Sequence, residues 1–117
     1  MGLQTRNKIV PQNILFICSK NIWRSPTAEF IAKTEYQLNA KSAGISAKAQ
    51  RKISNALLLW ADIIFVMGEK HLEYLQEHFG EVIAQKDIRV LDIPDVYKYM
   101  DPELITLLRY DLDFLVR

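Results

Sequence analysis

Short apolar runs alternate with longer amphipathic stretches along this chain of 117 residues. The apolar runs are typical of buried strands and predict strands at residues 13–17, 41–44, 61–68 and 88–93. The amphipathic stretches predict helices at residues 26–37, 53–59 and 69–79, and a C-terminal helix that begins at Asp101-Pro102-Glu103. Because strands and helices alternate, the pattern predicts a three-layer α/β fold in which helices cover both faces of a parallel sheet.

Proline, serine and glycine define several of the predicted helix ends. Pro26 suits the first helical turn, and Ser25 before it is the expected N-cap. Gly80 is expected to end the helix that begins at residue 69. Residues 1–11 are polar and end in Pro11, so we expect a loose N-terminal tail on a single domain that takes in residues 1–117.

Composition and charge exclude several classes of function. Half of the residues are apolar and a quarter are charged, as in a soluble globular protein, and the net charge of +1 argues against broad electrostatic binding of nucleic acid or of an anionic membrane. No apolar run reaches the length of a membrane span, and residues 1–12 lack the apolar core of a signal peptide. The single cysteine cannot form an internal disulfide, so we expect a cytoplasmic protein.

That cysteine, Cys18, lies where the first predicted strand passes into the first helix. Five residues separate it from Arg24, which Ser25 and Pro26 follow. A chain that curls from a strand into a helix N-terminus points backbone N–H groups inward and forms a nest for an anion. A thiol at the floor of that nest is favoured as thiolate, and the planar guanidinium of Arg24 can hold two phosphoryl oxygens at once. The pattern predicts attack on phosphorus by sulfur, whereas a lone buried cysteine would otherwise be a small core residue.

A thiolate nucleophile needs a group that protonates the leaving oxygen and later activates water. Parallel sheets bind ligands beyond the carboxyl ends of their strands, so a loop after the fourth strand should face Cys18. Asp95 lies in that loop and is the preferred candidate. Asp101 precedes Pro102 and is better explained as a helix N-cap, although it remains the alternative, and Asp92 is expected within the strand.

Other side chains allow more than one interpretation. Tyr97 is either an aromatic wall of the site or a half-buried loop residue, and Trp23 either flanks the mouth of the pocket or packs beneath it. His71 and His78 lie two helical turns apart, roughly 10 Å along the axis, which is too far to share a metal ion. We therefore expect both histidines at the surface and no metal site.

The sequence resembles the low-molecular-weight protein tyrosine phosphatases from the first strand to the C-terminal helix. The resemblance rests on Cys18-x5-Arg24-Ser25 near the N-terminus and on an aspartate loop much later in the chain. The other matching residues are Asn21, Ile22, Pro26, Ala28, Glu29, Ser42-Ala43-Gly44 and Tyr97. It implies a four-stranded parallel sheet in the order 2-1-3-4 with flanking helices.

The resemblance also implies roles for individual residues. Cys18 would be the nucleophile, Arg24 the phosphate clamp and Asp95 the general acid. Ser25 would hydrogen-bond the thiolate and help it leave, while Asn21 with Ser42 would hold the loop in its strained shape. The substrate would be bound by the loop residues together with Tyr97; these loop residues are Ser19, Lys20, Asn21, Ile22 and Trp23.

Several positions depart from the family pattern. Lys20 stands where the family usually has glycine, which often permits close backbone approach. Trp23 replaces the usual second cysteine, so Cys18 has no neighbour that could trap its oxidised form as a disulfide. Val96 interrupts the usual Asp-Pro-Tyr, and the segment between Gly44 and Ala61 is much shorter than in typical members.

The leading interpretation is a phosphomonoester hydrolase that works through a cysteinyl-phosphate, without metal or cofactor, on a phosphotyrosine-containing protein or a small aryl phosphate. Arsenate reductases use a similar loop but need further thiols, so that activity would require an external thiol. A non-catalytic module that binds phosphate or a partner is a third possibility, which Lys20 and Val96 leave open. A phosphoryl-carrier subunit of a sugar transport system can also place a phosphocysteine on a similar sheet, but Arg24-Ser25 favours hydrolysis.

Overall fold

The computed structural model describes residues 12–116. The strands are β1 (Asn13–Cys18), β2 (Asn39–Gly44), β3 (Ile63–Val66) and β4 (Asp87–Val90). The helices are α1 (Arg24–Glu35), α2 (Asn55–Trp60), α3 (Glu69–Ile83) and α4 (Pro102–Val116). The tail predicted for residues 1–11 lies outside the described residues. Within residues 12–116, no helix is both long enough and apolar enough to cross a membrane.

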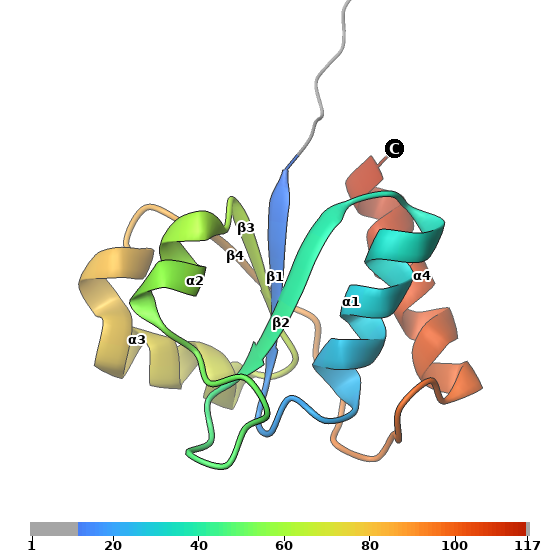
Figure 1. Cartoon of the computed structure of the whole chain (residues 1–117), viewed down its shortest axis with the longest axis horizontal. Coiled ribbons are helices and arrows are strands. Elements are labelled where there is room, and N and C mark those ends of the chain that lie inside the picture. Colours follow the sequence, from blue (N-terminus) through green and yellow to red (C-terminus); the bar gives the residue numbers. More distant parts are fainter. Residues whose placement is uncertain (1–11, 117) are drawn as a thin grey trace, which may run out of the picture.

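The four strands form one parallel sheet in the order β2-β1-β3-β4, which confirms the predicted α/β architecture (Figure 1). The central strand β1 pairs along its whole length with β2, in a register that sets Asn13 opposite Asn39 and Cys18 opposite Gly44. On its other side β1 pairs with β3, where Ile17 lies opposite Val66. All strands therefore end at the same edge of the sheet, and Cys18 is the last residue of its central strand.

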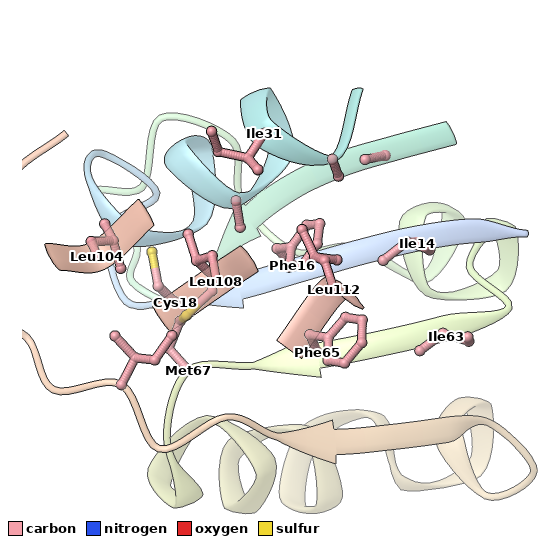
Figure 2. Close-up of a cluster of buried hydrophobic side chains, with 14 residues drawn as sticks. Ile14, Phe16, Cys18, Ile31, Ile63, Phe65, Met67, Leu104, Leu108 and Leu112 are labelled. Atoms are coloured by element: carbon pink, nitrogen blue, oxygen red, sulfur yellow. The ribbon is translucent and has the colours of Figure 1, made fainter. Parts of the chain in front are cut away.

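The two faces of β1 bury different sets of side chains because successive residues of a strand point to opposite sides. Ile14, Phe16 and Cys18 face α1 and α4, which lie together on one side of the sheet (Figures 1 and 2). Leu15 and Ile17 face α2 and α3 on the other side. Cys18 is thus the last member of a row of core side chains, and packing on both faces holds its backbone in place.

Most predicted element ends shift by one to three residues, and three differences concern residues to which the sequence analysis gave a structural role. The N-cap of α1 is Trp23 rather than Ser25, and it makes no side-chain capping bond. Helix α3 runs through the predicted stop at Gly80 and ends at Ile83, with one non-helical residue, Phe79, at a kink. Gly80 does not have the positive φ of a helix-ending glycine, so the helix continues past it. Strand β4 ends at Val90, so Asp92 lies beyond it, with a φ of 57°.

The start of α4 agrees with the sequence. Oδ1 of Asp101 accepts a hydrogen bond of 2.9 Å from the backbone N–H of Glu103, and Pro102 is the first helical residue. This satisfies one of the N–H groups that a helix start leaves without a partner. Asp101 thus has the capping contact that the sequence predicted.

The core against α4 should account for much of the stability. Leu108 is buried in the cluster that contains Phe16 and Ile31, whereas its neighbour Leu107 is 37% exposed. We expect Leu108→Ala to lower the free energy of unfolding by about 2–5 kcal/mol, because it leaves a cavity. Leu107→Ala should cost no more than about 1 kcal/mol. Urea denaturation measures both, and equal losses would contradict this assignment of the buried face.

Candidate active site

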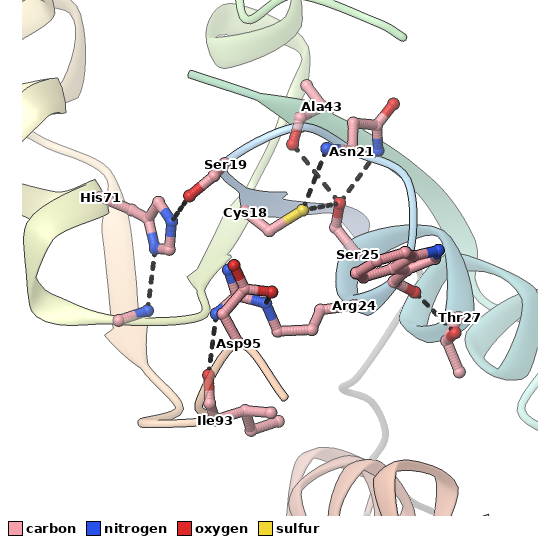
Figure 3. Close-up of polar contacts among 12 residues, drawn as sticks. Cys18, Ser19, Asn21, Arg24, Ser25, Thr27, Ala43, His71, Ile93 and Asp95 are labelled. Carbon is pink, nitrogen blue, oxygen red and sulfur yellow. Dashed lines mark hydrogen bonds and ion pairs between the residues drawn. The ribbon is translucent and has the colours of Figure 1, made fainter. Parts of the chain in front are cut away.

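The loop of residues 18–24 turns from the end of β1 into the start of α1 and encloses the sulfur of Cys18 (Figure 3). The backbone N–H of Asn21 donates to Cys18 Sγ at 3.2 Å, and the hydroxyl of Ser25 lies 2.9 Å from the same sulfur. Ser25 is in the first turn of α1, where its fully buried hydroxyl also lies near the carbonyl of Ala43. Because that hydroxyl faces sulfur and β2, it does not cap the helix.

Asn21 holds the middle of the 18–24 loop in a left-handed conformation, with a φ of 59°. Its side-chain amide is buried and donates to Ser25 Oγ and to Ser42 Oγ, at 2.9 Å each. The hydroxyl of Ser42 in turn donates to Glu29 Oε1 at 2.6 Å. A chain of hydrogen bonds from α1 and β2 therefore fixes a backbone conformation that asparagine tolerates better than most residues. The contact expected between Asn21 and Ser42 is present.

Arg24 and Asp95 meet beside the sulfur although 71 positions separate them in the sequence. The side chain of Arg24 is buried, and its Nη1 donates to the carbonyl of Ile93 at 2.9 Å. Its Nε lies 3.6 Å from Oδ1 of Asp95, whose side chain is 57% exposed. Figure 3 shows Arg24 and Asp95 on the side of Cys18 that faces the loop after β4. The structure thus places a fixed cation and an accessible carboxylate at one site.

A cavity of about 360 Å³ opens above the sulfur. It is lined by Cys18, Ser19, Lys20, Ile22, Trp23, Arg24 and Asp95. A second hollow of about 350 Å³ adjoins it, shares Arg24 and Asp95 with it, and is otherwise formed by the start of α3 and the loop after β4. Asp95 lines both, Asp92 lines only the second, and Asp101 lines neither. Of the three aspartates, only Asp95 is brought to the sulfur.

The structure separates the two aromatic candidates. Trp23 lines the cavity and is 42% exposed, so it flanks the mouth rather than packing beneath it. Tyr97 packs against the core cluster below α1 and α4, and its hydroxyl donates to Glu103 Oε2 at 3.1 Å. Tyr97 lines neither hollow. Of the two interpretations that the sequence allowed for Tyr97, its position favours that of a half-buried loop residue.

The prediction that His71 lies at the surface is wrong. The residue is fully buried, with Nδ1 accepting the N–H of Gly68 at 3.0 Å and Nε2 lying 3.0 Å from Ser19 Oγ (Figure 3). Since Nδ1 is an acceptor, the proton of the neutral ring is on Nε2, which donates to Ser19. Burial, followed by the charges of Arg24 and Lys70, lowers the pKa of His71 to about 4. His78 is exposed, as predicted.

The spacing of His71 and Leu75 along α3 could have indicated that His71 is buried. Leu75, four residues later, is also fully buried, so the two residues share the face of α3 that packs on the sheet. The polar character of histidine alone had favoured a surface position.

Lys20 stands where the family usually has glycine. It is exposed and does not have a positive φ, so its backbone conformation does not demand glycine.

No group of three or more histidine, cysteine or carboxylate side chains able to hold a metal ion occurs in the part of the chain that the structure describes. The buried cation that lines the cavity is Arg24, and the N–H of Asn21 points at the sulfur beside it. Both would attract an anion.

Comparison with known proteins gives the family. The family model described as "Low molecular weight phosphotyrosine protein phosphatase" matches residues 13–92. The chain belongs to this family. A relative from Acinetobacter johnsonii, the low molecular weight protein-tyrosine-phosphatase Ptp, is 31% identical over 116 residues, covering 75% of this chain and 82% of the relative.

Solved structures of the same fold agree. The tyrosine phosphatase Wzb from Escherichia coli K30, in complex with phosphate, has a TM-score of 0.73 at 23% identity and covers 92% of this chain and 97% of its own. A YwlE mutant from Bacillus subtilis has a TM-score of 0.69 at 23% identity, covering 91% and 99%. The solved structures confirm the predicted fold. The family model and the Acinetobacter relative confirm the predicted family and class of enzyme, a cysteine-dependent protein-tyrosine phosphatase.

Burial of neutral His71 predicts a dependence of stability on pH. An unfolded chain binds a proton at this histidine below about pH 6.5, whereas the folded chain resists it until about pH 4. The stabilising contribution is therefore present above pH 6.5 and is lost as the pH falls from about 6.5 to about 4. We expect His71→Asn, which keeps an acceptor for Gly68, to lose less stability between pH 7 and pH 5 than the wild type does.

Urea denaturation at the two pH values measures the difference. His78→Asn is the matched control, because His78 lies exposed on the same helix, and it should follow the wild type. Equal losses for the wild type and for His71→Asn would show that the buried imidazole is not the source.

Proposed function

We propose that this chain hydrolyses phosphotyrosine in proteins, or a small aryl phosphate, through a phosphocysteine at Cys18. One observation carries the proposal: the loop that donates an N–H to Cys18 Sγ also begins the helix that supplies Arg24, and Asp95 faces both across one cavity. The shared cavity supports the roles of nucleophile for Cys18, anion clamp for Arg24 and proton donor for Asp95. The family and the Acinetobacter relative support the same chemistry.

In the first step, Cys18 Sγ attacks phosphorus, the S–P bond forms and the P–O bond to the leaving group breaks. Asp95 gives its proton to the leaving oxygen. The inward N–H groups and the guanidinium of Arg24 hold the phosphoryl oxygens, where charge is spread in the transition state. The position of the Arg24 guanidinium is fixed, because its Nη1 donates a hydrogen bond to the carbonyl of Ile93.

In the second step, water attacks phosphorus and gives a proton to the carboxylate of Asp95. The S–P bond breaks, inorganic phosphate forms and sulfur leaves as thiolate. The hydroxyl of Ser25, 2.9 Å from Sγ, donates to the departing sulfur. Asn21 Nδ2 donates to the same oxygen. Of the two acceptors within reach of the hydroxyl proton, Sγ at 2.9 Å is nearer than the carbonyl of Ala43 at 3.5 Å, which favours donation to sulfur.

The mouth of the cavity supports an aromatic substrate. Ile22 and Trp23 are both partly exposed there, and they offer apolar and aromatic surface in the same cavity as Cys18, on which an aryl ring can pack. The hydroxyl of Tyr97 donates to Glu103, so Trp23, which lines the cavity, is the better candidate for the aromatic wall that the sequence had offered at Tyr97. The reaction requires Cys18 to stay reduced, which supports a reducing compartment such as the cytoplasm.

The direct test removes the nucleophile. Cys18→Ser should abolish hydrolysis of an aryl phosphate while leaving the circular dichroism spectrum and thermal unfolding close to those of the wild type. In the wild type, iodoacetate should alkylate Cys18, and inorganic phosphate should slow the alkylation by occupying the loop. Substantial hydrolysis by Cys18→Ser, or alkylation that phosphate does not affect, would refute the mechanism.

A second test concerns the acid. Asp95→Asn should slow turnover of phosphotyrosine, whose phenolate leaves poorly, by about 10²–10⁴-fold, the usual range for a lost general acid. It should matter much less for an activated aryl phosphate, whose leaving group scarcely needs a proton. Asp101→Asn is the matched control and should be mild with both substrates, because asparagine caps a helix nearly as well as aspartate. If Asp101→Asn selectively slows phosphotyrosine instead, the acid is Asp101.

A further inference from the structure

Residues 45–50, here called the brace, follow β2 and run beside the 18–24 loop. Backbone N–H groups of the brace donate to three consecutive carbonyls of that loop. The bonds are Ile45 N–H to Cys18 at 3.1 Å, Ser46 N–H to Ser19 at 2.9 Å and Gln50 N–H to Lys20 at 3.0 Å. None of these brace residues lines the cavity, so their contribution is made through the backbone of the loop.

These three bonds dictate where the next N–H groups point. In a planar trans peptide, the carbonyl of one residue and the N–H of the following residue point in opposite directions. Carbonyls of residues 18–20 that are held outward by the brace therefore turn the N–H groups of residues 19–21 the other way. One of them is seen to do so, because the N–H of Asn21 donates to Cys18 Sγ at 3.2 Å.

We propose that the brace is a positioning element that presets the anion-binding N–H groups of the 18–24 loop before a phosphate arrives. The inference rests on the proposed function, since it concerns how the same site is prepared. A nest that is already oriented need not reorganise when it binds, so its full interaction is available to the phosphoryl group.

The brace has the rigidity that this role requires. At its start, a Cβ built on Gly44 would lie 2.4 Å from the carbonyl oxygen of Ser19 and 2.8 Å from the Cβ of Ala49, so the approach of the two segments requires glycine. The N–H of Ala49 donates to the carbonyl of Ser46 at 3.0 Å and closes a turn over residues 46–49. Arg51 and Ile53, which follow the brace, make backbone hydrogen bonds with Gly44, which precedes it. These bonds fix the far end of the brace.

The sharpest test compares Gln50→Pro with Gln50→Ala. Both substitutions remove the exposed side chain, but only proline removes the N–H that holds the carbonyl of Lys20. Gln50→Pro should have a kcat/KM for an aryl phosphate about three- to tenfold below that of Gln50→Ala, the factor for one net hydrogen bond. Circular dichroism and thermal unfolding establish that both variants are folded at the assay temperature.

Ala47→Pro is the control for proline itself. Ala47 is the second residue of the 46–49 turn, where proline is favoured, and its N–H makes no hydrogen bond within residues 12–116. This variant should keep the kcat/KM of the wild type. Equal kcat/KM values for folded Gln50→Pro and Gln50→Ala would overturn the proposal, as would an Ala47→Pro variant that loses as much as Gln50→Pro.

A second measurement needs no substitution. In amide hydrogen exchange of the wild-type chain, the N–H groups of Ser46 and Gln50 should be protected, and inorganic phosphate should slow their exchange further because binding and bracing stabilise the same loop conformation. The N–H of Ala47 should exchange fast with or without phosphate. Exchange at Ser46 and Gln50 that phosphate leaves unchanged would contradict the inference.

Failure of the proposed function would look different. A wild-type chain that hydrolysed no aryl phosphate would refute the hydrolase, yet inorganic phosphate would still test the brace. Phosphate should then protect Cys18 from iodoacetate at a concentration about three- to tenfold higher in Gln50→Pro than in Gln50→Ala. Equal protecting concentrations would refute the brace alone.

Discussion

The left-handed backbone of Asn21 is the constraint on which the site depends. At a φ of 59° the chain reverses within the 18–24 loop, directly after the N–H that donates to Cys18 Sγ. A non-glycine residue in that region is strained, by an amount that the surroundings must offset. The offset comes from the side-chain amide, which is buried between Ser25 and Ser42 and satisfied by both. The same residue therefore supplies the reversal, the N–H at sulfur and the bonds that hold them.

The sheet determines what can surround that loop. With all strands parallel, β1 delivers Cys18, β2 delivers Ser42 and Gly44, and the loops after β3 and β4 deliver Gly68 and Asp95 to one edge. Ligands bind in this crevice because helix N-termini and loops converge there. Cys18 is on the central strand, so it receives support from both neighbours, through Ser42 and the brace on one side and through His71 on the other.

Much of this arrangement could be predicted from the sequence, and the parts that could not share a physical cause. Periodicity gave the strands and helices, and a local motif placed Cys18, Arg24 and Ser25 together because all three belong to one strand-to-helix turn. Contacts over long sequence separations carry no such local signal. His71 was expected at the surface, yet its partner Ser19 lies 52 positions away. Ser25 was expected both to cap α1 and, from the family resemblance, to hydrogen-bond the sulfur of Cys18. Only the second contact is present, because Cys18 and Asn21 occupy its hydroxyl. Gly80 lacked the left-handed conformation that would have made it a stop.

In the mechanism that we propose, the pairing of Arg24 with Asp95 would link phosphate binding to proton transfer. Oδ1 of Asp95 lies 3.6 Å from Nε of Arg24, and more than half of the Asp95 side chain is exposed to solvent. The contact is therefore a weak ion pair that contributes little to stability. A phosphoryl dianion offers Arg24 a stronger, bidentate partner and so displaces Asp95 without loosening the guanidinium, whose Nη1 stays bonded to Ile93. Asp95 lines the cavity above the sulfur, so in the proposed mechanism its carboxyl, once released and protonated, would remain within reach of the leaving oxygen. Thus one buried arginine can hold the acid while the site is empty and exchange it for substrate at the moment when the acid is needed.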